Sequence, residues 1–486
     1  MSEIVANDNR RSWTDFASGF LLAASFGYLL VSPTVGFGWI ESWHNEQRAA
    51  QVVLLAITAF AFGAMVLDAR YRAQLPRIHW IVIAVFALGA ISAARAKYID
   101  AAYAEVALHF LLVILIIVTA AAVARHPKRA ARLAQYGALL LLATYVLGVA
   151  VRYGAAVSLW RPLDLDVLLL GYANPRFPSA LHALLIPFAA SLAADPARRR
   201  LIRIVSFLVL AGIWAINLAL ATRAIWFAYM VSLPLLSILL GRRSTARIAV
   251  AVVASAGAGV LLYALLFRGL PAWIGFGESL QARSLDQLAS GSNRELLIRS
   301  SLEAIRSAPW LGIGPMQFAA IPGVWSAHPH NWLLQLASEW GLPAAGFTIW
   351  GLATLFRRAR AALSGTPASD YGPVAFITAG AVALVYGLVD GSLVMPVSQT
   401  AAALVFGGLI ASSSRLAFPE RLKPSANGGV PLIAFGAAIL GVVCSTHLSR
   451  FVVQTVGAMT AVEQKGASAV LWPRFWSNGF LPFRSR

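Results

Sequence analysis

The sequence predicts an all-α, polytopic membrane protein of about 12–13 transmembrane helices, with one long loop outside the membrane that contains short helices. Two observations predict this fold class. Hydrophobic residues make up 59% of the 486 residues, charged residues only 12%, and the mean hydropathy is +0.71, whereas soluble domains carry about 25% charged residues. The apolar residues also gather in blocks near the ~20 residues that a helix needs to cross a bilayer, and a β-barrel would show shorter, alternating segments.

The apolar blocks follow one another along the chain at residues 13–33, 50–67, 79–94, 106–124, 133–151, 179–194, 202–219, 221–240, 247–266, 329–353, 373–389, 397–414 and 429–447. The first block follows a polar start with Arg10 and Arg11, as in a signal peptide, but no small-residue cleavage site follows it. We therefore interpret it as a membrane helix. The single cysteine, Cys444, lies inside an apolar block and excludes an internal disulfide framework.

The net charge of +19 is distributed among the loops rather than gathered on one soluble face, which argues against nucleic-acid binding. Taking the N-terminus as cytoplasmic, the loops on that side hold about three times as many Lys and Arg residues as the short outer loops, as the positive-inside rule requires. We therefore expect a multi-pass protein with a cytoplasmic N-terminus, and the family resemblance given below implies that its membrane is the bacterial inner membrane. Residue 330 then lies on the periplasmic side.

The organisation that we expect has four parts. Residues 1–266 form the first nine membrane helices, 267–328 a long periplasmic loop subdomain, 329–447 the C-terminal membrane helices and 448–486 a periplasmic or interfacial tail. A loop of the length of 267–328 tends to be functional. The tail mixes aromatic residues with arginines, which is typical of a segment at the membrane interface.

Within the long loop, Ser292 and Glu295 form a capping box that predicts a helix ending near Ser307. Its alternating charges predict salt bridges along one face, formed by Glu295, Arg299, Glu303 and Arg306. Arg294 is left out of that face. It lies in the first helical turn, where free backbone N–H groups and the helix dipole favour an anion. Arg294 is thus a candidate anion ligand, with a surface arginine as the alternative.

Two further outer arginines are candidates for anion binding. Arg223 lies between two apolar blocks at the outer membrane boundary, where it is either functional or reaches the lipid headgroups. Arg176 lies between Pro175 and Pro178, which restrict its backbone, and it either binds a ligand or caps the sixth membrane helix. If Arg176, Arg223 and Arg294 converge, they form a cationic pocket suited to a diphosphate, because each guanidinium can bind phosphate oxygens through two hydrogen bonds.

His330 has an ordinary pKa of about 6.5 and can accept a proton at neutral pH. It competes for this role with His328, and a structural histidine is the alternative. Asn331 could orient a substrate or start the following helix. Asp390, on the outer side between the eleventh and twelfth blocks, could orient His330 or pair with an arginine.

Asp164 and Asp166 form an Asp-x-Asp pattern in an outer loop, and carboxylates of this kind suit Mg²⁺ or Mn²⁺. The pattern is short and lies in a different loop from His330. We therefore expect no metal at the site, with metal binding by these two residues as the alternative.

Several motifs resemble those of the O-antigen ligase and polymerase superfamily. They are Arg294, Pro309, Leu311-Gly312-Ile313-Gly314-Pro315, His330-Asn331-Trp332-Leu333-Leu334-Gln335 and Glu339-Trp340-Gly341-Leu342-Pro343. The resemblance covers residues 290–346 in detail, and the many spans and Thr222-Arg223 fit more loosely. Two residues depart from the pattern: Thr222 stands where serine is usual, and Met316 where a small residue is common.

The resemblance implies a GT-C-like glycosyltransferase that needs no cofactor and works on the periplasmic face. Its donor is an undecaprenyl diphosphate-linked glycan within the membrane lipids, and its acceptor is a hydroxyl group of lipid A core or of another glycan. His330 is then the general base, and Arg223 and Arg294 hold the diphosphate. We expect an O-antigen ligase acting on lipid A core. An O-antigen or exopolysaccharide polymerase is the main alternative, and a protein O-oligosaccharyltransferase is less favoured. A transporter is also less favoured, because the charges cluster at membrane boundaries rather than at mid-bilayer.

Overall fold

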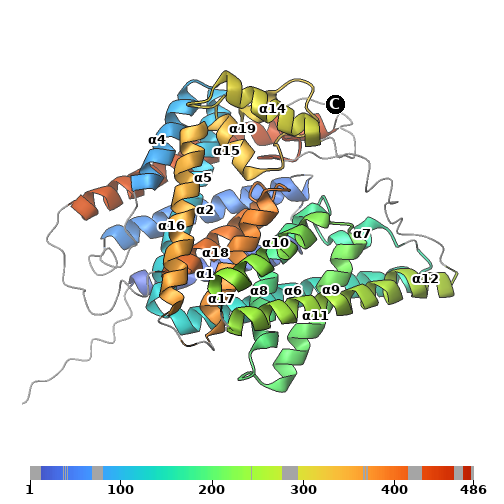
Figure 1. The fold of residues 1–486 in the computed structure, drawn as a ribbon. Coiled ribbons are helices and arrows are strands. Elements are labelled where there is room, and N and C mark those ends of the chain that lie inside the picture. Colours follow the sequence, from blue (N-terminus) through green and yellow to red (C-terminus); the bar gives the residue numbers. More distant parts are fainter. Residues whose placement is uncertain are drawn as a thin grey trace, which may run out of the picture.

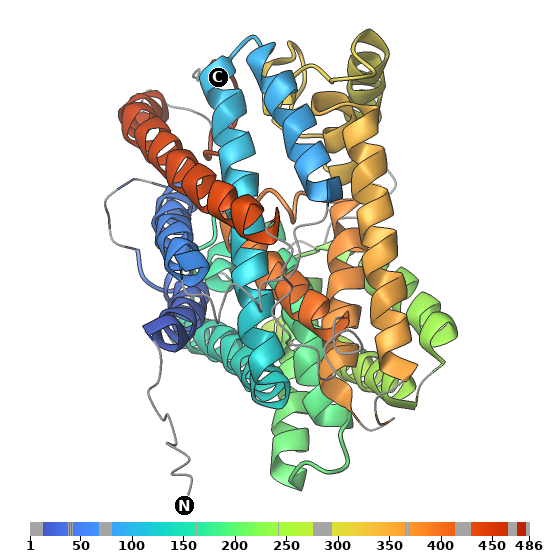
Figure 2. The ribbon, with the colours of Figure 1, turned by 90° about the vertical axis from the view of Figure 1, so that its left-hand side faces the viewer.

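The computed structural model is a bundle of helices (Figures 1 and 2). It describes residues 13–36, 42–67, 80–161, 163–241, 243–275, 294–364, 370–413, 429–464 and 474–482, with the single positions 38, 40 and 367. Across these ranges the chain forms helices, turns and bends, and no strand. The capping residue Ser292 lies outside the described residues.

Each predicted apolar block contains helix. The helices of the first half are α1 (Trp13–Val31), α2 (Trp43–Leu67), α4 (Trp80–Ala94), α5 (Ile99–Arg125), α6 (Pro127–Ser158), α7 (Leu165–Leu169), α8 (Arg176–Ala194), α9 (Arg200–Ala219) and α10 (Arg223–Leu240). Those of the second half are α11 (Arg243–Tyr263), η1 (Ala264–Gly269), α12 (Leu270–Trp273), α14 (Arg294–Ser307), η2 (Gln317–Ala320), α15 (Trp332–Glu339), α16 (Leu342–Ser364), α17 (Tyr371–Gly387), α18 (Pro396–Ser413) and α19 (Gly429–Gln464).

Eight helices of the described chain are long and apolar enough to cross a membrane. They are α2, α5, α6, α8, α9, α10, the continuous run Arg243–Trp273 and the part Leu432–Val456 of α19. Three shorter apolar helices, Ala17–Val31, Trp80–Ala94 and Tyr371–Gly387, join them. Helices satisfy their own backbone hydrogen bonds, which lipid requires. The all-α, polytopic membrane architecture is confirmed, with fewer full-length spans in the described part than the twelve to thirteen expected.

The helix α8 lies at the centre of the bundle. The most apolar stretch of α8 is 89% buried, the largest share among the eight spans. The helix contacts α6, α9, α11, α17 and α18. Figure 1 shows α16 rising steeply, whereas α6 and α11 run closer to the horizontal on its right. The short helices α14 and α15 pack on each other at the upper end of this view. The N-terminus of α8 points to the site described below.

The tenth predicted span, residues 329–353, is divided into two helices. Helix α15 ends at Glu339 and α16 begins at Leu342, with Gly341 at φ +91° between them. A side chain at Gly341 would approach the Trp310 carbonyl oxygen to 2.2 Å, so only glycine fits this turn. The single span expected here is therefore wrong, because apolar character alone does not reveal a turn inside a block.

The C-terminal part also differs from expectation. Helix α19 continues through the boundary expected at residue 447 and ends at Gln464. Residues 474–482 then lie inside the protein: Phe475 is 4% and Trp476 0% exposed, and Trp476 donates a hydrogen bond to Thr455 on α19. The aromatic rings of these residues therefore pack against the bundle.

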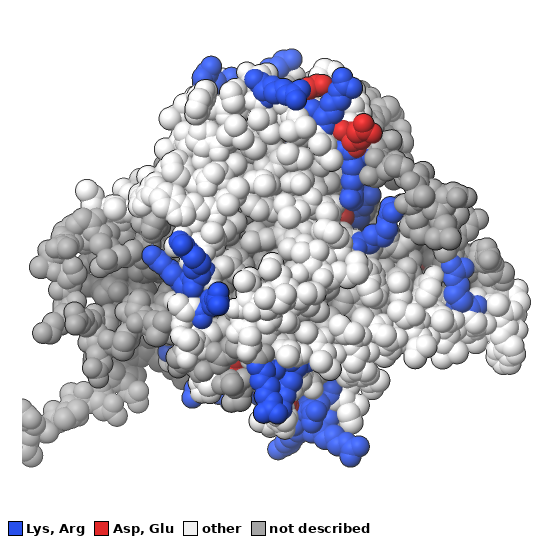
Figure 3. All heavy atoms as spheres, viewed as in Figure 1, with Lys and Arg blue, Asp and Glu red and all other residues white. Residues whose placement is uncertain are grey.

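The distribution of charged side chains on the surface agrees with that expected for a membrane protein. In Figure 3, Lys and Arg side chains lie at the upper and lower ends of the molecule and in smaller clusters at mid-height, and much of the surface between these clusters is free of charge. Large apolar side chains are exposed on several spans, among them Leu147, Ile238 and Val253. Such a band is expected where helices face lipid.

Candidate active site

The loop that carries His330 is held by a pairing between two glycine-containing turns. The backbone N–H of Ile313 donates to the Ser338 carbonyl at 2.9 Å, and that of Gly314 to the Glu339 carbonyl at 3.0 Å. Gly312 has φ +69°, and a side chain there would approach the Glu339 backbone to 2.3 Å. The Leu-Gly-Ile-Gly and Glu-Trp-Gly motifs are therefore two halves of one tight contact that fixes where α15 begins and ends.

Local geometry then orients His330 itself. Its φ of +53° is one that residues other than glycine rarely adopt, and such conformations cluster at functional sites. Its backbone N–H donates to Nδ1 of His328 at 3.2 Å. Asn331 accepts from the backbone N–H groups of Leu333 and Leu334, each at 3.0 Å. Of the two roles open for Asn331, the structure shows the helix start, and its carboxamide oxygen is engaged as the N-cap of α15.

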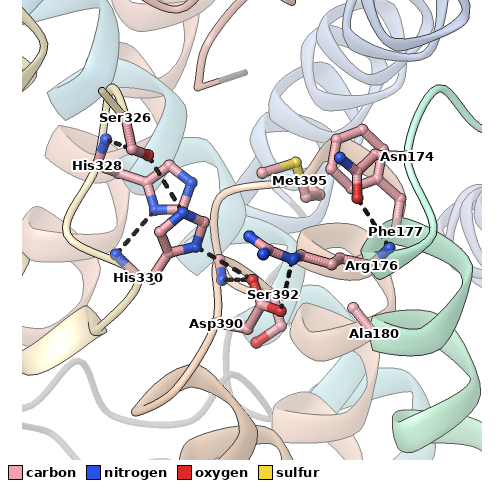
Figure 4. A pocket seen from close by; sticks show the side chains of 11 residues that line it. Asn174, Arg176, Phe177, Ala180, Ser326, His328, His330, Asp390, Ser392 and Met395 are labelled. Atoms are coloured by element: carbon pink, nitrogen blue, oxygen red, sulfur yellow. Dashed lines mark hydrogen bonds and ion pairs between the residues drawn. The ribbon is translucent and has the colours of Figure 1, made fainter. Parts of the chain in front are cut away.

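The imidazole of His330 has a polar partner on each nitrogen (Figure 4). Nδ1 lies 3.2 Å from Oδ1 of Asp390, and Nε2 lies 3.2 Å from the hydroxyl oxygen of Ser326. Trp325 stacks on the ring at a centroid distance of 5.5 Å. With a proton on Nδ1 donated to the carboxylate, Nε2 keeps a lone pair and can accept a proton from a hydroxyl group.

Arg176 enters the site from the opposite side, at the N-terminus of α8 (Figure 4). The side chain of Asn174 accepts from the Arg176 backbone N–H at 3.0 Å and so fixes this helix start. The Nε atom of Arg176 lies 3.8 Å from Oδ2 of Asp390. One carboxylate therefore faces both the imidazole and a guanidinium, which remains one-third exposed.

These side chains line one pocket, part of which is open to the outside. His330, Asp390 and Arg176, three of the predicted site residues, line it together. The remaining lining residues are Asn174, Phe177, Ala180, Ser326, His328, Gly391, Ser392 and Met395. The sequence left open whether Asp390 contacts His330 or an arginine, and in the structure it contacts both.

Burial and charge set the protonation of the pair. Burial lowers the pKa of His330 below its usual value, Asp390 opposes this shift, and the charges of Arg176 and Arg294 add to it. Burial would raise the pKa of Asp390, but the His330 hydrogen bond and the Arg176 charge hold it below its usual value. Burial lowers the pKa of His328 well below its usual value. At neutral pH the site therefore holds neutral imidazoles beside a charged carboxylate.

Arg294 and Arg223 do not line this pocket but lie close to it. Arg294 is half-buried at the start of α14. Burial lowers its pKa, the charge of Asp390 opposes that shift, and the charges of Arg176 and Arg223 reinforce it. The charges of Arg176 and Arg223 therefore both act on Arg294, which supports the convergence of the three residues without showing a shared cavity. The predicted end of this helix at Ser307 is confirmed, as is the ion pair between Arg299 and Glu303 at 3.0 Å.

Arg223 is exposed at the first residue of α10. The preceding residue, Thr222, is buried and donates to the backbone oxygen of Asn217 at 3.1 Å. Asn217 also contacts Nδ1 of His182 on α8 at 3.1 Å. Thr222 stands where serine is usual, and its hydroxyl group anchors the turn before Arg223 to the core.

Of the two residues in the Asp-x-Asp pattern, Asp164 has a structural role. Asp164 is the N-cap of α7 and accepts from the Val167 backbone N–H at 3.3 Å. The side chain of Asp166 lies outside the described residues. No group of three or more His, Cys, Asp or Glu side chains suited to a metal occurs within the described ranges.

Sequence reasoning missed three residues around His330. Ser326 and Trp325 precede the histidine cluster and could have been found only by their nearness to it in sequence. Arg474, whose guanidinium donates to the Ala327 carbonyl at 3.2 Å, comes from the far end of the chain. Its only sequence signal is an arginine within an aromatic run, which equally indicates a membrane interface.

The fold and the site together define a multi-pass membrane protein with a buried imidazole–carboxylate pair beside several guanidinium groups. Such a site can remove a proton from a hydroxyl group next to a bound anion. Residues 207–349 match the family Wzy_C, described as O-antigen ligase. This match supports the resemblance to the O-antigen ligase superfamily, and the matched segment includes Arg223, Arg294 and His330. No curated protein matches the chain.

Proposed function

We propose that this protein transfers a glycan from an undecaprenyl diphosphate carrier to an acceptor hydroxyl group, most simply as an O-antigen ligase acting on lipid A core. The observation that carries the proposal is the contact of His330 with Asp390 beside Arg176, within a chain that matches the O-antigen ligase family. A neutral imidazole serves as a base, and guanidinium groups stabilise a departing diphosphate.

In the proposed reaction, Nε2 of His330 takes the proton of the acceptor hydroxyl group. The acceptor oxygen forms a bond to the anomeric carbon, the bond from that carbon to the phosphate oxygen breaks, and the carrier diphosphate leaves with the electron pair. The Ser326 hydroxyl group now lies 3.2 Å from Nε2, and in the proposed reaction the acceptor hydroxyl group takes its place at this nitrogen. The displacement is direct and inverts the anomeric centre.

The other residues stabilise charge. Asp390 holds the Nδ1 proton and stabilises the imidazolium that forms. We assign the diphosphate to Arg176, Arg223 and Arg294, because the charges of Arg176 and Arg223 both act on Arg294. The charge distribution along the sequence supports a site on the periplasmic face of the inner membrane.

The test is glycan transfer by purified protein in detergent, with a labelled undecaprenyl diphosphate-linked glycan and lipid A core. The wild type should transfer the glycan without a sealed compartment, which a transporter would not do. The variant His330→Ala should lose about 10²- to 10⁴-fold in kcat while still binding the donor. His447→Ala, on α19, is the matched control and should keep full activity. Full activity of His330→Ala would reject the role of the imidazole.

Analysis of the surface glycans of cells that lack the protein distinguishes between the two acceptors. A ligase predicts that long glycan chains are missing from lipid A core. A polymerase predicts that lipid A core carries single repeats only. The family match agrees with either outcome, so this experiment decides the acceptor.

A further inference from the structure

Residues 474–482 contact two separate parts of the protein that support the site. Arg474 is 2% exposed, and Trp476 and Ser477 are 0% exposed. The backbone N–H of Leu481 donates to the Ala319 carbonyl at 3.0 Å, and that of Ser477 donates to the side chain of Asn45 on α2 at 2.8 Å. The segment therefore joins the turn before the histidine loop to the membrane helix α2.

Arg474 ties this segment to the His330 loop. Its Nη1 atom donates to the carbonyl oxygen of Ala327 at 3.2 Å, three residues before His330. The same guanidinium binds both oxygens of Glu105 on α5 at 2.8 Å and Oε1 of Glu339 on α15 at 2.6 Å. One cation thus fixes the loop between α5 and the end of α15.

A second buried arginine ties the segment to the Asp390 loop. Arg48 on α2 is 1% exposed, and its Nη2 atom donates to the Val394 carbonyl at 2.5 Å, four residues after Asp390. Its Nε and Nη2 atoms donate to the carbonyls of Phe475 at 3.1 Å and Arg474 at 3.2 Å. The segment is therefore anchored to both loops that supply the imidazole–carboxylate pair.

Neither arginine lines the pocket, so neither is placed to touch a substrate there. Buried ion clusters seldom add stability over apolar packing, and their best-attested benefit is to fix a register between segments. The register here is that between the loop at Ala327 and the loop at Val394. Their separation in turn sets the distance from Nδ1 of His330 to Oδ1 of Asp390.

We propose that residues 474–482 are a strap that sets the relative position of the His330 and Asp390 loops, with Arg474 as its positioning residue. The mechanistic consequence rests on the proposed function, whereas the structural one does not. Loss of the strap should loosen the loop around His330 and reduce the catalytic step, and donor binding at the outer arginines should persist.

The obvious variant, Arg474→Met, leaves two buried carboxylates without their cation and is expected to fold poorly. The decisive variant is therefore R474M/E105Q/E339Q, which makes the cluster neutral and removes the donor to the Ala327 carbonyl. The amide at position 339 can still accept from the Phe318 backbone N–H, which now bonds Oε1 of Glu339 at 2.8 Å. Arg450→Met, on the exposed face of α19, is the matched control.

Two measurements on full-length protein test the strap. Hydrogen–deuterium exchange of peptides covering residues 324–331 should become roughly tenfold faster in the triple variant and stay unchanged in Arg450→Met. The kcat for glycan transfer should fall on the order of 10²-fold, because misplacement of a catalytic group slows the chemical step. The KM for the lipid-diphosphate donor should stay within about twofold, since the guanidinium groups that bind it are untouched.

The proposed strap would be overturned if the triple variant exchanged hydrogen at the wild-type rate. It would also be overturned if that variant kept the wild-type kcat, or if only its KM for the donor changed. Failure of the proposed function is separate: it appears as a wild-type protein that transfers no glycan, or as a fully active His330→Ala. In that case the exchange measurement still decides whether residues 474–482 hold the loop.

Discussion

The Nδ1 atom of His330 lies 3.2 Å from Oδ1 of Asp390, although sixty residues of chain separate them. The carboxylate is 7% exposed and the imidazole 6%. Contact with a buried carboxylate selects the tautomer with the proton on Nδ1, which leaves Nε2 as the acceptor facing Ser326. The pairing therefore decides which nitrogen can act as a base.

Asp390→Asn should reduce kcat for glycan transfer on the order of 10²-fold or more. An amide no longer stabilises the imidazolium, and its NH₂ group can hold His330 in the opposite tautomer. Steady-state kinetics would measure this effect as a loss in kcat with donor KM little changed. Asp100→Asn, at an exposed site on α5, is the control and should behave as the wild type. Equal activity of the two variants would contradict the tautomer argument.

The pH dependence of kcat/KM should follow the lowered pKa of His330. The base must be neutral, and burial moves its pKa below the usual value of about 6.5. Activity should therefore stay level from pH 8 down to about 6.5 and fall only at lower pH. In Asp390→Asn the acid limb should move lower still, because the carboxylate raises the pKa of His330. An acid limb centred above pH 7 would be inconsistent with this site.

Arg294→Ala should weaken donor use, and Arg299→Ala should not. Both arginines lie on α14, but Arg299 is 78% exposed and pairs with Glu303, whereas Arg294 is half-buried near Asp390, Arg176 and Arg223. A lost charge-assisted contact to phosphate costs about 1.5–3 kcal/mol, so kcat/KM should fall roughly 10- to 150-fold. A similar fall in both variants would show that α14 contributes charge in general rather than one ligand.

Gly341→Ala should destabilise the protein and impair transfer. An alanine at φ +91° is strained, and its Cβ would lie 2.2 Å from the Trp310 carbonyl oxygen. We expect a loss of about 2–4 kcal/mol, visible as a lower thermal unfolding midpoint in detergent. Gly346→Ala, on α16, is the control, since nothing lies within 4 Å of its added Cβ. Tolerance at position 341 would mean that the pairing with the Leu-Gly-Ile-Gly turn is dispensable.

Transfer should persist in EDTA, and Asp166→Asn should retain activity without added metal. Asp164→Ala should cost about 1 kcal/mol through the lost N-cap of α7 and leave kcat near the wild-type value. The measurement is transfer with EDTA and after addition of Mg²⁺ or Mn²⁺. Inactivation by EDTA that Mg²⁺ or Mn²⁺ reverses would favour the Asp-x-Asp alternative.

The fold class was predictable because membrane helices are selected by apolar length. Every predicted block contains helix in the structure. The division at Gly341 was not predictable from hydropathy, since the turn depends on a close approach of the Trp310 carbonyl from another loop.

The site was predictable in its chemistry and less so in its layout. His330, Asp390 and Arg176 were each recognised as polar groups at membrane boundaries, and they meet in one pocket. Arg294 and Arg223 lie beside that pocket rather than in its lining. Ser326 was missed because a serine in a polar loop carries no signal of its own.

The sequence by itself determined the membrane class, the helices and the identity of the titratable groups, because these depend on local composition and on the cost of charge in lipid. Only the tertiary structure decided that Asp390 faces His330 and that Arg474, from a segment read as interfacial, binds Glu105, Glu339 and the Ala327 carbonyl. The physical reason is that contacts between residues far apart in sequence arise from helix packing, and hydropathy and local spacing contain no information about which helices pack together.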